Sequence, residues 1–266
     1  FNQGDYFIFY AQGPHRWDYV NGYFTHTYNI YSDEAYYFIS VDEGIGTTKR
    51  VNIVDNTGLL SNNSVNTYTY YDFIESDVKN FGETGQQWYG DAFDVQTSRD
   101  YSFSLPGGAS SSVQIKVAAA GVATQSSSLS VLSGSSSLGV LYFSSVGDSY
   151  ASESVQRFSY MPASGQTSLP LTLTYSKPSV SSAAFLDYIE IEAKCQLQMT
   201  SSQFSFSSPE SVGIAKITEF SISNANNQVH VWDVTDLSQV YEIEGQLSGG
   251  VLKIKSETEQ LRKFIA

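Results

Sequence analysis

Residues 189–199, Ile-Glu-Ile-Glu-Ala-Lys-Cys-Gln-Leu-Gln-Met, alternate apolar and polar side chains without interruption. Successive side chains of a β-strand point to opposite faces of the sheet, so this stretch predicts one long strand. We expect its apolar side to lie in a core and its other side, which carries Glu190 and Glu192, to lie in water. The only thiol, Cys195, falls on the apolar side and is expected to be buried and unreactive.

Further strands are predicted in both directions from this stretch. Residues 113–117 and 169–175 alternate in the same way, and the apolar runs 6–10 and 36–41 are typical of strands that are covered on both faces. Loops rich in Ser, Gly and Asn separate the strands at the spacing of a sandwich or barrel. We therefore predict an all-β fold: an antiparallel β-sandwich of the jelly-roll type plus an additional β-rich module.

Little helix is expected. Residues 72–80 could form two helical turns, and Ser-Glu-Thr-Glu at 256–259 fits a capping box. The residues that follow this box, 262–266, are equally compatible with a strand.

Composition divides the chain into three parts. An aromatic-rich β module is expected over residues 1–102 and a β-sandwich over 103–203, because aromatic and Asn residues give way to Ser, Val and Leu near residues 100–108. Residues 204–266 carry further strands, which either extend the first module or lead to a catalytic domain beyond them. The apolar run 6–10 lies so near the start that we expect the chain to be a piece of a longer protein.

The charge balance excludes several classes of partner. Lys and Arg number 14 against 27 Asp and Glu, which gives a net charge of −13. Such a chain is a poor match for nucleic acid or for an anionic membrane surface. A single cysteine allows no intrachain disulfide, and no apolar run reaches the roughly 18 residues of a membrane helix.

No catalytic or cofactor motif is recognisable. His15, His26 and His230 stand apart without a metal-binding spacing, so each reads as a surface histidine or a structural one with satisfied hydrogen bonds. The Ser-rich stretch 134–139 lacks the spacing of a nucleophile elbow, and no phosphate loop or dinucleotide fingerprint is present. We expect neither catalytic residues nor a cofactor in this chain.

Two weaker candidates for binding remain. Asp91, Asp94 and Asp100 are the candidate calcium ligands, with an ordinary solvated acidic surface as the alternative. Trp88 lies between glycines, as an exposed interface anchor would, and core packing is the alternative. Trp17, Trp88 and Trp232 could also serve as stacking platforms for a sugar.

Six segments resemble, in the same order, the region that precedes the catalytic domain in PorU-like sortases of the type IX secretion system, a family of gingipain-type cysteine peptidases. The segments are residues 4–17, 31–39, 85–90, 185–191, 231–236 and 261–266. They span essentially the whole chain.

The resemblance implies a function without assigning a catalytic residue. In the family, the histidine of a Gly-His-Gly-like stretch and the catalytic cysteine lie downstream of the region matched here, and Cys195 does not match the nucleophile. The implied role is a non-catalytic scaffold or recognition region of a sortase that processes C-terminal sorting signals of secreted cargo. Implied partners are other domains of the parent chain, secreted cargo and secretion-system proteins, at the outer-membrane surface of the cell envelope or outside the cell. The alternative is a stand-alone carbohydrate-binding or adhesion module, and an unrecognised hydrolase is a third reading.

Overall fold

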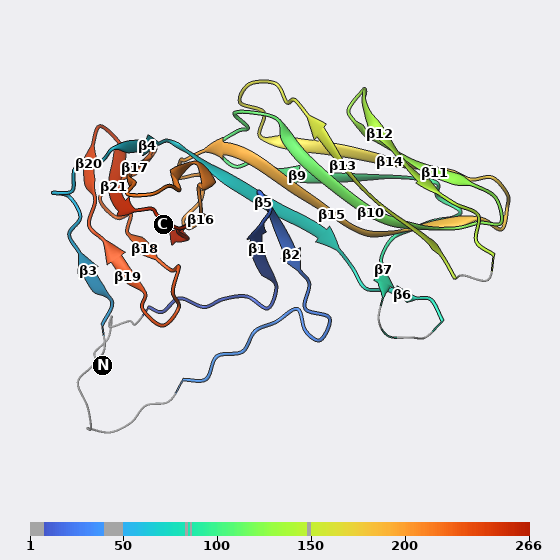
Figure 1. Ribbon diagram of the computed structural model, residues 1–266, viewed down its shortest axis with the longest axis horizontal. Helices are drawn as coiled ribbons and strands as arrows, with labels where there is room; N and C mark the ends of the chain where they lie inside the picture. The colour runs from blue at the N-terminus through green and yellow to red at the C-terminus, as the bar shows by residue number, and fades with distance from the viewer. Residues whose placement is uncertain (1–7, 40–49, 83–84, 86, 148–149) are drawn as a thin grey trace. The chain divides into compact units, whose positions relative to one another are not determined.

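The computed structural model describes residues 8–39, 50–82, 85, 87–147 and 150–266 (Figure 1). The chain forms two compact units, and each is assembled from separate stretches of sequence. One unit contains residues 17–30 and 70–196, and the other contains residues 1–16, 31–69 and 197–266. The expected division at residues 102 and 203 therefore differs from the units that the structure shows.

The first unit is a β-sandwich of two sheets, one of five strands and one of four. One sheet has the order β13 (Ser152–Tyr160), β10 (Val113–Val122), β15 (Ala183–Gln196) and β5 (Thr67–Glu75), and the short β8 (Ala92–Phe93) also pairs with β15. The other has the order β12 (Ser136–Phe143), β11 (Ser127–Ser133), β14 (Ser168–Ser176) and β9 (Ser98–Ser104). Apart from the two-residue β8, eight strands are divided equally between the two sheets, which is the distribution of a jelly roll, so the predicted fold class is confirmed.

The sandwich core follows the period-two patterns of the sequence. Leu169, Leu171 and Leu173 of β14 are buried, and so are Ile189 and Cys195 of β15. The inward side of the 189–199 stretch was therefore predicted correctly. The sandwich also recruits β5 and β9, which begin before residue 103, because these strands close the edges of its two sheets.

The prediction for the outward side of β15 was wrong. Glu190 is only 3% exposed, and Glu192 is half-buried. A hairpin of β1 (Arg16–Val20) and β2 (Tyr23–Thr27) covers this side, and the backbone N–H groups of Phe24 and His26 donate to the two carboxylates. Polar side chains can thus lie in a covered face because the hairpin supplies hydrogen-bond donors.

The second unit contains two smaller sheets. One has the order β16 (Ser205–Phe206), β22 (Phe264–Ile265), β18 (Val231–Asp233), β19 (Tyr241–Ile243) and β3 (Asn52–Val54). The other has the order β20 (Gln246–Ser248), β21 (Val251–Glu257), β17 (Ile217–Ile222) and β4 (Asn63–Val65). Phe264 packs against Phe206 and Phe220 with ring centroids 5.1 and 5.0 Å apart.

The strands after residue 204 pair with strands from early in the chain. β17 pairs in parallel with β4, and β19 pairs in parallel with β3. The strands after residue 204 therefore share sheets with β3 and β4. An extension of the early strands was one of the two possibilities that the sequence left open.

Both predicted helices are absent from the described residues. Residues 72–75 continue strand β5, and residues 79–80 form β6 (Lys79–Asn80), which pairs with β7 (Trp88–Tyr89). Residues 256–257 end β21 and residues 264–265 form β22, so the strand alternative holds at this end. The described helical content is one 3₁₀ turn, Pro209–Ser211. Tertiary pairing outweighed weak local helix signals in both places.

Two predicted strands near the start are not seen where they can be described. The apolar run 6–10 is described only from residue 8 and the run 36–41 only up to residue 39. The described parts of both runs form no strand. Phe38 is 99% exposed, so an apolar run alone did not ensure burial there.

Candidate functional site: an acidic pocket beside a buried histidine

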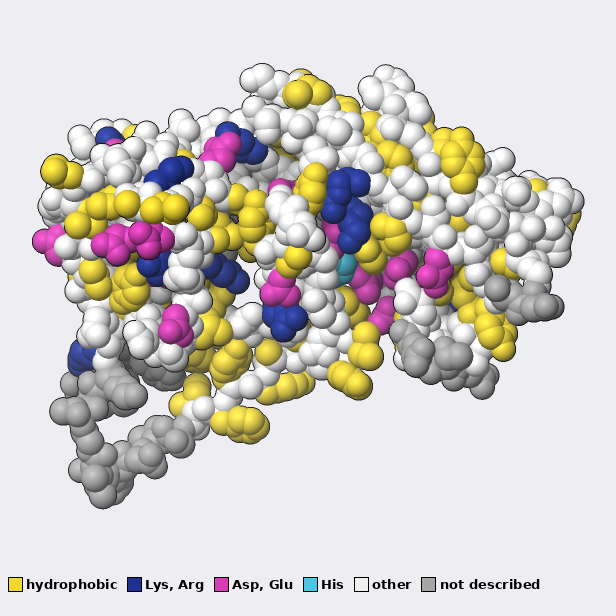
Figure 2. Space-filling view, viewed as in Figure 1, with side chains coloured by type: hydrophobic (Ala, Val, Ile, Leu, Met, Phe, Trp, Pro, Cys, Tyr) yellow, Lys and Arg dark blue, Asp and Glu magenta, His cyan; other side chains and the backbone are white. Residues whose placement is uncertain are grey.

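The sandwich unit has a cavity of about 270 Å³, whose lining includes residues of the hairpin strand β2 and of the sheet strand β15. Glu75 at the end of β5 and Asp187 of β15 line it, together with Trp88 of β7 and the neighbouring Gln87. Tyr28, just after β2, adds a second aromatic ring. On the face shown in Figure 2, acidic side chains gather around a small histidine surface. The pocket therefore combines aromatic walls with carboxylate and amide groups.

A β-bulge places Asp187 in this pocket. In the pairing of β10 with β15, Ala118 lies opposite Tyr188 and Ala119 lies opposite Leu186, so Asp187 is the extra residue. A bulge redirects the side chain of the inserted residue. Because Leu186 and Ile189 both stay in the core, Asp187 and Tyr188 are both left to line the pocket.

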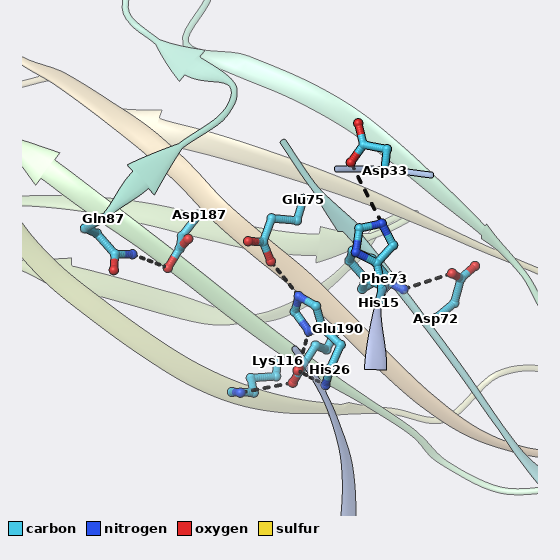
Figure 3. A network of polar contacts seen from close by, with 10 residues as sticks. All are labelled: His15, His26, Asp33, Asp72, Phe73, Glu75, Gln87, Lys116, Asp187 and Glu190. Carbon is cyan, nitrogen blue, oxygen red and sulfur yellow. Dashed lines mark hydrogen bonds and ion pairs between the residues drawn. The ribbon is translucent and has the colours of Figure 1, made fainter. Parts of the chain in front are cut away.

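Asp187 lies in an environment that disfavours its charged form. Burial raises the pKa of Asp187 to about 7, and the charges of Glu75, Glu153 and Asp77 act in the same direction. The amide Nε2 of Gln87 donates to the Asp187 Oδ2 at 3.0 Å and partly opposes this shift (Figure 3). The pocket is thus an electronegative site at neutral pH.

His26 forms the inner boundary of the pocket. Its Nδ1 lies 2.6 Å from the Glu190 Oε1, and its Nε2 lies 2.5 Å from the Glu75 Oε2 (Figure 3). Burial alone would lower the pKa of His26, but the hydrogen bonds to Glu190 and Glu75 raise it above its ordinary value. The ring stacks on Phe73 with centroids 4.2 Å apart.

Lys116 and His26 both stabilise the anionic form of Glu190. Lys116 Nζ lies 3.0 Å from the Glu190 Oε2, and the imidazole of His26 contacts the other oxygen. Burial would raise the pKa of Glu190, but the hydrogen bonds from His26 and the adjacent charge of Lys116 lower it below its ordinary value. Lys116 also lies 4.8 Å from the ring centroid of Tyr188, within cation–π distance.

This geometry favours binding over acid–base catalysis. Both ring nitrogens of His26 are occupied by carboxylates, so neither is available to a substrate. Cys195 is 0% exposed in the core, where burial raises the pKa of its thiol to about 12. No nucleophile–base pair is therefore formed by the cysteine and histidines that the structure describes.

The three candidate calcium ligands have separate partners. Asp91 accepts a hydrogen bond from Tyr101 at 2.9 Å, Asp94 pairs with Lys177, and Asp100 accepts from Thr172 at 2.7 Å. Among the residues that the structure describes, no group of three or more His, Cys, Asp or Glu side chains could hold a metal ion. The structure thus does not bring Asp91, Asp94 and Asp100 together.

The tryptophans and the other histidines have different surroundings. Trp88 is half-buried at the pocket, so it is neither the fully exposed anchor nor the fully buried core residue that were the two alternatives. Trp17 packs on Tyr71 with centroids 4.6 Å apart, and Trp232 borders an open groove of the second unit. His15 lies 3.9 Å from Asp33, and the exposed His230 lies 2.6 Å from Glu242.

Sequence reasoning did not identify Glu75 or Asp187 as pocket residues. The interrupted alternation at Leu186–Ile189 was the available signal for Asp187, because two adjacent residues that face the same way indicate a bulge. No sequence signal paired Glu75 with His26, which lies 49 residues away in the chain.

No family model matches the chain, and no curated protein matches it by sequence. Among solved structures, the chain is similar to dimeric latent PorU from Porphyromonas gingivalis, with 18% identity and a TM-score of 0.79. That alignment covers 97% of this chain and 26% of PorU, so the chain spans about a quarter of its relative.

Two carbohydrate-binding modules align with smaller parts of the chain. A CBM36 module in complex with calcium and xylotriose aligns with 46% of this chain and 98% of its own, at 17% identity and a TM-score of 0.32. The CBM36-1 domain of a xylanase from the hindgut metagenome of Trinervitermes trinervoides covers 46% of this chain and 96% of its own, at 12% identity and a TM-score of 0.33. At these scores the two modules add nothing to the fold assignment. The comparisons therefore establish a fold shared with PorU over nearly the whole chain.

Proposed function

We propose that this chain is a non-catalytic β region of a gingipain-type sortase, which acts as a scaffold or in recognition while the parent processes C-terminal sorting signals of secreted cargo. The observation that carries the proposal is the likeness to PorU, which extends over 97% of the chain and both of its units. The six sequence segments that resemble the family support it independently. Its partners are then other domains of the parent, cargo and secretion-system proteins at the outer-membrane surface.

The absence of a working dyad is part of this proposal. His26 is engaged on both ring nitrogens, and Cys195 is enclosed in the sandwich core.

Among the described residues, no helix is long and apolar enough to cross a membrane.

The decisive experiment is to read the gene beyond the codon for Ala266. A gingipain-type domain with a Gly-His-Gly-like stretch and a cysteine is expected there, and a stop codon would contradict the proposal. The purified chain should cleave no peptide. Thiol-dependent peptidase activity that Cys195→Ala abolishes would also overturn it.

Trp88 is the proposed contact for a partner. In the full-length parent, Trp88→Ala should lower processing of a cargo signal while the sandwich stays folded, since Trp88 is half-buried at a pocket rim. Trp232→Ala, in the other unit, is the matched control. Unfolding caused by Trp88→Ala would assign this residue to the core instead.

A second function, carbohydrate binding, is favoured by the composition of the pocket. Trp88 could stack on a sugar ring while Gln87 and Asp187 bind its hydroxyl groups. Calorimetric titration of the chain with a panel of oligosaccharides tests this reading. Binding that Trp88→Ala abolishes and Trp232→Ala leaves unchanged would support it, and a complete lack of binding would exclude it for the sugars used.

A further inference from the structure

The β1–β2 hairpin is attached to the sandwich by side chains. β1 and β2 form a two-stranded sheet of their own, and neither is part of the backbone ladder of the neighbouring sheet. Aromatic contacts supply part of the attachment, because Phe24 stacks on Tyr71 at 4.3 Å and Trp17 packs on the same ring. A hairpin held in this way can separate without breaking a strand pairing.

Two carboxylates of β15 substitute for the missing ladder. Glu192 Oε2 accepts a hydrogen bond from the backbone N–H of Phe24 at 2.8 Å, and Glu190 Oε1 accepts from that of His26 at 3.0 Å. The residues alternate on both strands, so the spacing of the carboxylates matches the spacing of the N–H groups. The carboxylates of β15 thus fix the register of β2.

His26 is the cation between these acidic groups. Its ring nitrogens contact Glu190 and Glu75, and its side chain is 3% exposed. Ionised carboxylates only accept hydrogen bonds, and a neutral imidazole has one N–H to donate. While Glu75 and Glu190 are both ionised, the two contacts are therefore satisfied together only by the doubly protonated imidazolium, which carries a positive charge.

The surrounding charges make this proton important. The charged side chains that face the hairpin or line the adjoining pocket come from four elements: Glu75 and Asp77 from β5 and the stretch after it, Asp187, Glu190 and Glu192 from β15, Lys116 from β10, and Arg157 from β13. The titratable tyrosines beside them are Tyr28, Tyr71 and Tyr188. Without the His26 charge, five carboxylates face two cations. Removal of the proton also leaves one of two buried carboxylate contacts without a donor.

We propose that His26 is a proton-dependent clasp, whose imidazolium fastens the β1–β2 hairpin across Glu75 and Glu190 and releases it when the proton is lost. Release uncovers the aromatic side chains Tyr71 and Phe73 and the inner side of the acidic pocket. This inference concerns a property of the fold and does not depend on the proposed sortase role.

The direction of the pH dependence follows from the two states. Docking raises the pKa of His26 above the ordinary value that the free hairpin would have. Protonation therefore favours docking, fully so below about pH 6.5, the ordinary value for histidine. The stabilisation is lost as pH rises through the raised value of the docked state.

Hydrogen exchange of the whole chain tests the clasp. Between about pH 6 and about pH 9, after correction for intrinsic exchange, protection of the Phe24 and His26 amides should fall about tenfold more than that of Val117 and Ile189 in the core. Equal changes at the hairpin and the core would overturn the proposal. An NMR spectrum that shows a neutral His26 ring at about pH 6 would overturn it as well.

Variants separate the clasp from general stability. His26→Gln has no titrating ring, so the hairpin amides should be less protected at low pH and should lose the selective pH response. The matched control is His230→Gln, since His230 also contacts a carboxylate but its side chain is 65% exposed. A pH response retained in His26→Gln or lost in His230→Gln would contradict the assignment. If His26→Gln fails to fold, the comparison of wild-type amides decides the matter alone.

Discussion

The environment of Cys195 gives a quantitative prediction for thiol chemistry. The side chain is 0% exposed, and burial raises the pKa of the thiol from an ordinary value of 9.0 to about 12. Because the thiolate is the reactive form, this shift leaves roughly a thousandfold less of it at neutral pH. A thiol reagent should therefore modify the native chain only as fast as the sandwich opens, and it should react at once after denaturation.

Substitution at this position tests the packing. Cys195→Ser places a hydroxyl among apolar neighbours such as Ala193 and Leu197, which are each 1% exposed. A buried hydroxyl without a partner costs about 1–3 kcal/mol, so the midpoint of urea unfolding should fall accordingly. Cys195→Ala, which removes the sulfur without adding a polar group, is the control and should destabilise less.

Two results would refute this reasoning. Rapid labelling of the native protein would mean that the thiol is accessible and that the inward side of β15 is assigned to the wrong alternate residues. Equal or greater stability of Cys195→Ser would show that the hydroxyl finds a hydrogen-bond partner in the core.

Three further outcomes are expected. Gly121→Ala should destabilise the sandwich by about 1–3 kcal/mol in urea unfolding, because the new Cβ would lie 2.6 Å from Phe143; wild-type stability would mean that Phe143 can move aside. Asp187→Asn should raise the melting temperature more at about pH 8 than at about pH 4. The pKa of Asp187 is raised to about 7 in the folded state, so this carboxyl destabilises the fold only at a pH where it is ionised in the unfolded chain. An equal gain at both pH values would rule out the electrostatic cause. Phe264→Ala should cost the second unit about 3–5 kcal/mol through a cavity, measured by calorimetry; a loss below about 1 kcal/mol would show that Phe206 and Phe220 close the gap.

The sequence was most informative where a residue's surroundings follow from its own strand. Alternation along residues 189–197 predicted correctly that Cys195 points into the core. The same pattern predicted water on the side of Glu190, because a local pattern records polarity and cannot show what covers it. The cover comes from His26, 164 residues away, which brings the hydrogen bonds that make burial of a carboxylate tolerable.

The candidate site was harder to predict for a related reason. Its members come from β2, β5, β7 and β15. No two of these strands are consecutive in the chain. Asp187 gains its position from a bulge, and Trp88 from a two-residue strand. Neither feature produces a periodic pattern, so pairing partners had to be known before the pocket could be recognised.

The parallel pairing of β4 with β17 has a consequence for biogenesis. Residues 63–65 leave the ribosome long before residues 218–220, their partners in the ladder. At a synthesis rate of roughly 5–20 residues per second, the delay is roughly 8–30 s. During this interval the early strand has exposed N–H and C=O groups and no native neighbour, which is a state prone to wrong association. Holdase chaperones that bind nascent β-strands should therefore matter more for this chain than for a protein in which neighbouring strands are consecutive.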